Sequence, residues 1–168
     1  MTANLETQWI VGFVDGEGCF HLDVHVKEDM RWGLQMQPEF TVVQHECERQ
    51  VLEALKADFG CGSVGLNRKD NTSTRLHYRC KNVQHLNDKI LPFFEKHKLK
   101  TKKRIEFERF RHVVHKMHAG YHNLSLKNFL EVIQLGEDLR VRFSKSKRTK
   151  VEEILDNLRL RSVADPTL

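Results

Sequence analysis

The pattern of hydrophobic and polar positions predicts a strand at residues 20–27, where the two kinds of residue alternate. A second alternating segment covers residues 34–43, and two more cover residues 63–69 and 74–81. A period of two places successive side chains on opposite faces of a sheet, so each strand is expected to bury one face. Pro38 falls on the apolar side of the second strand, which predicts an edge position or a bulge there.

Helical spacing accounts for most of the remaining chain. The first predicted helix covers residues 4–15, and Gly16 and Gly18 after it are expected to take positive φ. A second helix covers residues 46–59, where apolar residues recur at every fourth position. Further helices are predicted at residues 83–96, 101–118, 126–139 and 149–160. The order αββαββα with added C-terminal helices predicts an α+β fold, in which helices cover one face of a four-stranded antiparallel sheet.

The polar faces of the four predicted strands combine into one broad surface. It comprises His21, Asp23, His25, Lys27, Gln35, Gln37, Glu39, Thr41, Asn67, Lys69, Arg75, His77, Arg79 and Lys81. A single polar strand face is usually only solvated, but four of them, with basic residues on the last strand, favour a ligand. A sheet of this width can follow the major groove of DNA, where side chains distinguish base edges.

Length and charge refine this picture. The 168 residues, of which 39 % are hydrophobic, are expected to form one domain over residues 1–168 with a buried core. Residues 96–116 hold nine Lys and Arg against two Glu, and residues 140–150 hold six and no acid. Residues 1–18, in contrast, contain three acids and no Lys or Arg. This segregation predicts an acidic centre between basic surfaces, as expected where carboxylates hold metal ions against phosphates.

Several classes of protein are excluded on sequence grounds. The chain lacks a long apolar run, so no membrane partner is expected, and neither a signal nor a transit peptide is recognised. The four cysteines have no CxxC spacing and are expected to be reduced. A bacterial cytoplasm or an organelle interior, chloroplast or mitochondrion, is the expected location. No small-molecule substrate is predicted.

Residues 10–18, with the sequence IVGFVDGEG, combine features that point to chemistry. Gly12 and Gly16 remove side chains from one helix face, so the backbone of a second copy can approach closely. Two helix C-termini would then meet, and Glu17 with the Gly16 carbonyl would form an oxygen-only site suited to Mg²⁺. The alternative, a glycine-ended helix with solvated acids, is disfavoured by the strand that follows. The predicted contact between copies involves Trp9, Gly12, Phe13, Asp15 and Gly16.

This segment resembles the LAGLIDADG motif of homing endonucleases, with Glu17 in place of the second Asp. The resemblance implies a homodimer, because one motif makes half of an active site. It also implies site-specific hydrolysis of double-stranded DNA at a long, partly palindromic target. Mg²⁺ would be the cofactor, with Mn²⁺ able to substitute. Glu17 would be both a metal ligand and a catalytic residue.

Further roles follow from the resemblance by position. Gln44 matches a Gln that positions water at the end of the second strand. Lys100 matches a Lys close to the scissile phosphates, although Lys98 or Lys102 could hold that place, and these two are expected at least to contact DNA. Arg49 follows Glu48, which stands where a basic residue is expected, so Arg49 is the catalytic candidate there. Arg142, Lys145 and Lys147 are predicted to contact backbone phosphates.

Other functions are compatible with the same pattern. An RNA maturase that assists intron splicing, or a DNA-binding regulator without cleavage, would retain the fold. A metal-independent structural dimer would explain the helix but not the basic sheet. The acids at both motif positions favour the endonuclease.

Overall fold

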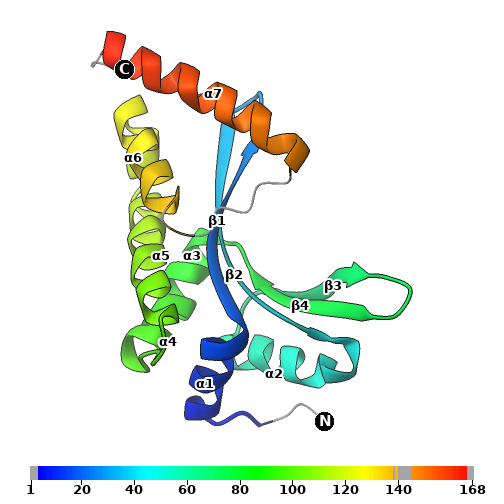
Figure 1. Ribbon diagram of the computed structural model, residues 1–168. Coiled ribbons are helices and arrows are strands. Elements are labelled where there is room, and N and C mark those ends of the chain that lie inside the picture. Colours follow the sequence, from blue (N-terminus) through cyan, green and yellow to red (C-terminus); the bar gives the residue numbers. More distant parts are fainter. Residues whose placement is uncertain (1–3, 138, 140–144, 166–168) are drawn as a thin grey trace. The chain divides into compact units, whose positions relative to one another are not determined.

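The computed structural model describes residues 4–137, 139 and 145–165 (Figure 1). The helices and strands are α1 (Thr7–Glu17), β1 (Gly18–Val26), β2 (Leu34–His45), α2 (Arg49–Phe59), β3 (Ser63–Lys69), β4 (Thr74–Cys80), α3 (Val83–His85), α4 (Leu91–Lys96), α5 (Lys103–His118), α6 (Leu126–Glu137) and α7 (Lys145–Ala164). A 3₁₀ turn at Glu46–Glu48 precedes α2, and a π-helical turn at Leu86–Ile90 joins α3 to α4. The predicted α+β fold with the order αββαββα is confirmed.

The sheet has the strand order β1-β2-β4-β3. β2 pairs antiparallel with β4 from Phe40 to His45, and β3 pairs antiparallel with β4. β2 is therefore an inner strand, and the edge position predicted from Pro38 is wrong. Proline is accommodated because Pro38 precedes the segment that pairs with β4, so its missing N–H removes no bond from that ladder.

The end of α1 differs from the sequence prediction. The helix continues through Glu17, so Gly16 is helical, and Gly18 has an extended backbone with φ of −71°. The expected positive φ at both glycines is thus wrong. Gly18 is required for space instead, since a Cβ there would lie 2.6 Å from Val14 Cγ1 and 2.7 Å from the Val14 carbonyl oxygen.

The chain groups into two units. The first unit consists of Met1–Phe20 and Glu39–Glu108. Its core is an aromatic cluster in which Phe20 stacks on Phe40 with ring centroids 4.8 Å apart. The other rings of the cluster belong to Phe59, Tyr78, Phe94 and Phe107. These rings come from three strands and three helices, so they hold the end of α1 and the start of α5 on one scaffold.

The second unit consists of His21–Pro38 and Arg109–Leu168. Gly136 of α6 lies against Leu22 of β1, because a Cβ there would be 2.3 Å from Leu22 Cδ2. Arg159 of α7 donates to the Glu137 carboxylate at the end of α6 at 2.7 Å. The expectation of a single domain remains a prediction. No helix within the described residues has the length and apolar character needed to cross a membrane.

Candidate active site and nucleic-acid interface

One face of α1 is open. A Cβ built on Gly12 or Gly16 would meet no heavy atom within 4 Å among the described residues. Trp9 on the same face is 43 % exposed and stacks on Phe13 with centroids 4.7 Å apart. The buried residues of the helix are Ile10, Val11 and Val14. Packing within the chain therefore does not account for the two glycines, and the strip they form is available to another backbone.

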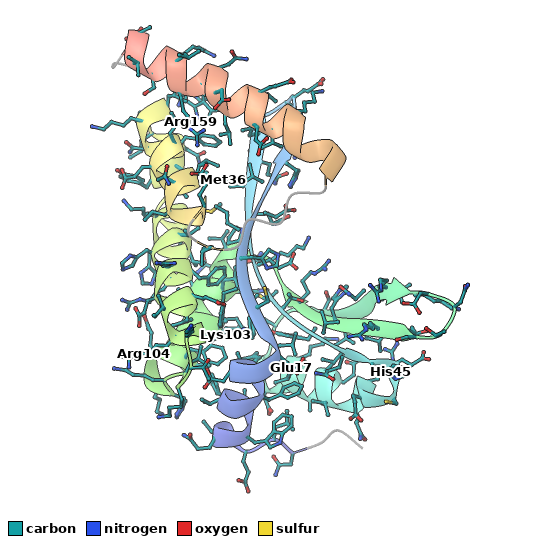
Figure 2. The ribbon with its side chains drawn as sticks, viewed as in Figure 1. Glu17, Met36, His45, Lys103, Arg104 and Arg159 are labelled. Atoms are coloured by element: carbon teal, nitrogen blue, oxygen red, sulfur yellow. The ribbon has the colours of Figure 1, made fainter. Side chains whose placement is uncertain are left out.

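Glu17 is the last residue of α1, and its side chain is exposed at the junction with β1 (Figure 2). Its carboxylate makes no hydrogen bond or ion pair with any described residue. The C-terminal end of a helix carries partial negative charge, so an uncompensated carboxylate there favours a cation. The available donors are carboxylate and carbonyl oxygens, which suit a hard divalent ion such as Mg²⁺.

Asp15 holds a distant segment of its own chain. Its carboxylate accepts the Lys100 N–H at 2.7 Å, the Thr101 N–H at 3.2 Å and the Thr101 hydroxyl at 2.9 Å. The Thr101 hydroxyl oxygen in turn accepts the Lys103 N–H at 3.1 Å, which caps the start of α5. Asp15 thus positions the lysine-rich turn next to the end of α1. Its contribution to a contact between copies stays a prediction.

Lys103 is the functional candidate that the sequence analysis missed. Figure 2 labels Lys103 at the start of α5. Its Nζ donates to the Gly18 carbonyl oxygen at 2.6 Å, and its side chain is only 17 % exposed. An ammonium group therefore lies one residue from Glu17. The sequence offered only a partial signal, because Thr101 is a typical N-cap residue and marks the start of a helix, but not the contact of Lys103 with Gly18.

The lysines chosen from the sequence are placed differently. Lys98, Lys100 and Lys102 are exposed, and none of their ammonium groups contacts a described residue. Gln44 lies near the end of β2, half-buried and paired with Leu76 of β4. The catalytic roles predicted for Lys100 and Gln44, and the DNA contacts of Lys98 and Lys102, stay predictions.

Arg49 begins α2 on the exposed surface. Its guanidinium lies 3.6 Å from the Glu53 carboxylate one helical turn further on. Such an exposed ion pair contributes little to stability, so Arg49 remains available for another partner. The catalytic role predicted for Arg49 also stays a prediction.

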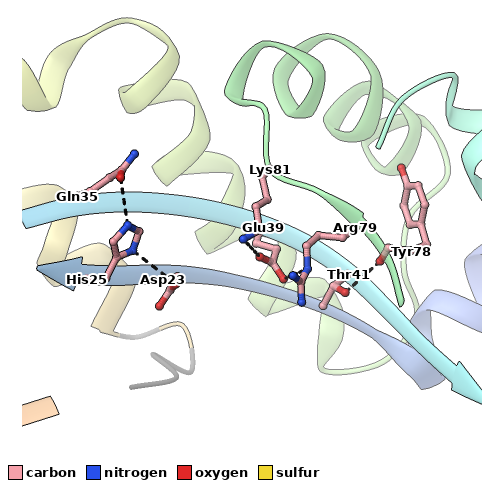
Figure 3. Close-up of polar contacts among 8 residues, drawn as sticks. All are labelled: Asp23, His25, Gln35, Glu39, Thr41, Tyr78, Arg79 and Lys81. Carbon is pink, nitrogen blue, oxygen red and sulfur yellow. Dashed lines mark hydrogen bonds and ion pairs between the residues drawn. The ribbon is translucent and has the colours of Figure 1, made fainter. Parts of the chain in front are cut away.

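Part of the predicted DNA-binding surface is an ion cluster around a buried acid, Glu39. Glu39 is 4 % exposed, and its carboxylate lies 2.8 Å from Arg79 Nε and 3.2 Å from Lys81 Nζ (Figure 3). Thr41 is also buried, and its hydroxyl donates to the Tyr78 carbonyl oxygen at 3.0 Å. Glu39 therefore orients the side chains of Arg79 on β4 and of Lys81 just after it. This arrangement favours a role for the buried acid in positioning these two cations.

His77 lies on the same strand as Arg79. Burial, together with the positive charge of Arg79, lowers the pKa of the His77 imidazole below its usual value. The ring is consequently neutral at neutral pH and offers one donor and one acceptor. His77, Arg79, Lys81, Asn82 and His85 line a cavity of about 400 Å³.

The remaining predicted DNA contacts divide by exposure. Asn67, Lys69 and Arg75 are exposed at the outer end of the β3–β4 hairpin. In the second unit, His21 is buried, and His25 lies 3.6 Å from the Asp23 carboxylate and 3.1 Å from the Gln35 side-chain oxygen. Lys27 and Gln37 are half-buried. Arg142 and the side chains of Lys145 and Lys147 lie outside the described residues.

The chain belongs to a class of α+β proteins defined by the order αββαββα and by a first helix that ends in Asp-Gly-Glu. Residues 10–114 match the family described as LAGLIDADG endonuclease, and the chain belongs to this family. It is 38 % identical to the homing endonuclease I-TnaI, with a TM-score of 0.79, and the match covers 90 % of this chain and 99 % of that one. It is 26 % identical to I-SmaMI bound to an uncleaved DNA target in the presence of calcium ions, with a TM-score of 0.76. That match covers 88 % of this chain and 49 % of I-SmaMI.

The chain matches only part of the length of each of these curated relatives. A probable intron-encoded endonuclease of Neurospora crassa is 28 % identical over 168 residues. The match covers 93 % of this chain but only 36 % of that relative. For the homing endonuclease I-ApeII of Aeropyrum pernix, at 29 % identity, the matching part is 60 % of the relative.

Proposed function

We propose that the protein is a homing endonuclease that hydrolyses both strands of DNA at a specific site with the help of a divalent metal ion. The observation that carries this proposal is the arrangement at the end of α1. Glu17, an exposed carboxylate that pairs with no described residue, ends a helix with an open glycine face. The ammonium group of Lys103 from α5 is bound to the carbonyl oxygen of the next residue, Gly18. The DNA target described for I-SmaMI supports DNA as the substrate.

The active form is a homodimer built on α1. The proposed metal site takes one carboxylate from each chain, and within the described residues one chain holds no group of three or more His, Cys, Asp or Glu placed to hold a metal ion. The Gly12 and Gly16 strips of two chains would let the helices pack closely and bring both Glu17 side chains together. I-SmaMI, of which this chain covers 49 %, supports a unit of twice this size. A two-fold dimer requires a target with two related half-sites.

Each residue of the site has a defined task. Glu17 and the Gly16 carbonyl would hold the cation, Mg²⁺ or, as a substitute, Mn²⁺. When bound, such an ion supplies Lewis-acid stabilisation of phosphate charge and lowers the pKa of bound water. Gln44 orients the attacking water. The Lys103 ammonium, held by the Gly18 carbonyl, stabilises the negative charge that develops on the phosphate.

A cleavage assay tests the proposed function directly. The full chain is incubated with a plasmid that carries the DNA site into which its coding sequence inserts, in the uninterrupted, intron-less form. Separate reactions contain Mg²⁺, Mn²⁺ or a chelator. We expect linear product only with metal, and none from a plasmid with a scrambled site. Tight binding without cleavage in either metal would identify a regulator instead, and binding of intron RNA in place of DNA would identify a maturase.

Replacing Lys103 with Met should slow cleavage by about 100-fold or more, because a preorganised charge near the phosphate is lost. DNA affinity should change only a few-fold, since this ammonium is held inside the chain by Gly18. Single-turnover rates and filter binding measure the two effects. Lys102→Met is the matched control, because its exposed ammonium is predicted to contact a DNA phosphate, so its loss should weaken binding. A similar pattern for both variants would remove Lys103 from the mechanism.

A further inference from the structure

Two thiols that are distant in the sequence lie next to each other in the first unit. Cys61 follows α2, and Cys80 is the last residue of β4. Their Sγ atoms are 3.9 Å apart, and both cysteines are free thiols. Cys61 is 8 % exposed and Cys80 is 1 % exposed. Neither has a task in the proposed DNA cleavage.

The strand register explains why the thiols meet. Ser63 of β3 pairs with Arg79 of β4, so the chain just before β3 runs beside the end of β4. Gly62 allows the close approach, because it has a positive φ of 83°. A Cβ on Gly62 would also lie 2.7 Å from the Tyr78 ring and 2.8 Å from the Arg79 carbonyl oxygen. Cys61 is therefore held against β4 by a turn that only glycine can form without strain.

The surroundings make the two thiols chemically unequal. The pKa of Cys61 is lowered to about 7, mainly by the hydrogen bond with Cys80. Burial raises this pKa, whereas the Tyr78 hydroxyl at 3.8 Å and the charge of Lys89 lower it further. Lys89 is fixed nearby, because its Nζ donates to the Gly60 carbonyl oxygen. The same hydrogen bond and burial raise the pKa of Cys80. At neutral pH, a substantial fraction of Cys61 is therefore thiolate, whereas Cys80 keeps its proton.

We propose that Cys61 and Cys80 are a modification site at which a peroxide forms a reversible disulfide. The Cys61 thiolate attacks one peroxide oxygen, the O–O bond breaks, and hydroxide leaves while Cys61 becomes a sulfenic acid. The sulfur of Cys80 then attacks the sulfenic sulfur, the S–O bond breaks, and the Cys80 proton leaves with the hydroxide as water. Two thiols are oxidised, one peroxide is reduced, and a thiol reductant reverses the reaction.

The disulfide would tie together the two ends of the β3–β4 hairpin. The cross-link closes a loop of about 20 residues, which restricts the unfolded chain and should raise the melting temperature by roughly 5–10 °C. The hairpin carries Asn67, Lys69 and Arg75, which are predicted to contact DNA. Oxidation therefore acts on the element that presents these side chains, and the inference holds whether or not the chain cleaves DNA.

The test uses the full-length variant in which Cys19 and Cys47 are both replaced by Ser, so that only the two thiols in question remain. The variant is treated with hydrogen peroxide, denatured, alkylated with iodoacetamide and analysed by mass spectrometry. We expect the mass of two hydrogen atoms to be lost, no alkylation, and a cross-linked peptide pair that contains Cys61 and Cys80. A thiol reductant should restore both alkylation sites and the original melting temperature.

Two further variants make the outcome decisive. Adding Cys80→Ser, which keeps a hydrogen-bond donor beside Cys61, should stop peroxide oxidation at the Cys61 sulfenic acid, which dimedone detects. Adding Cys61→Ser should leave Cys80 unreacted under the same conditions. The proposal is overturned if the two-thiol variant keeps both alkylation sites after peroxide, or if the only disulfide formed joins two chains.

Discussion

Replacing Glu17 with Gln is expected to reduce the cleavage rate by at least about 1000-fold, because the neutral amide removes the anionic oxygen donor from the metal site. The fold should persist, since the Glu17 side chain is exposed and touches no described partner. Thermal stability should remain or rise slightly, because a negative charge is removed from a helix C-terminus. Single-turnover cleavage, DNA affinity and thermal melting measure the three effects.

Glu6→Gln is the matched control for this variant. Glu6 precedes the same helix, is exposed, and makes no side-chain capping bond. It carries the same charge change at the other end of α1, so its cleavage rate should stay within about two-fold of the unaltered protein, as for an ordinary surface substitution. If Glu17→Gln also cleaves within about tenfold of the unaltered protein, Glu17 is not a metal ligand in the reaction.

Replacing Gly12 with Leu should prevent dimer formation, with the dissociation constant rising by about 100-fold or more, because overpacking at a close helix contact is costly. The isolated chain should tolerate the change, since a Cβ at Gly12 meets no described heavy atom. Helix propensity even favours Leu over Gly by roughly 0.5–1 kcal/mol. Sedimentation with and without DNA measures whether the variant dimerises. The helical circular dichroism signal measures whether it is folded.

Gln8→Leu provides the comparison, since it adds the same side chain to an exposed position of α1. The Gln8 variant should remain dimeric at the concentrations at which the Gly12 variant is a monomer. The glycine strip loses its assigned role if the unaltered protein binds DNA as one chain per duplex. The same conclusion follows if Gly12→Leu dimerises as well as the unaltered protein.

Most of the secondary structure could be predicted, because hydrophobic periodicity is a local property of the chain. The strand at Ser63–Lys69 has the predicted bounds. The segment at 83–96 is helical throughout, as predicted, but its middle part, Leu86–Ile90, is a π-helical turn. Side-chain burial was less predictable. Leu66 alternates like a residue on a covered face, yet it is 59 % exposed, because β3 lies at the edge of the sheet.

Strand burial also depends on what covers each face. The polar pattern predicted an accessible row of side chains on β2, but Glu39 and Thr41 are buried in the structure. Alternation along one strand reports which side chains share a face. Alternation cannot predict that Arg79 and Lys81 pair with Glu39, because these two residues come from the neighbouring strand and the turn after it.

The sequence by itself determined the order of the elements, the open strip of Gly12 and Gly16, and Glu17 as the acid at the helix end. These features depend on residues within a few positions of one another, whose relative placement the helix geometry dictates. Only the tertiary structure decided which lysine lies at the end of this helix, because Lys103 and Gly18, which are in contact, are 85 positions apart. The proximity of Cys61 and Cys80 likewise depends on the register of β3 with β4, which cannot be predicted from the spacing of cysteines in the sequence.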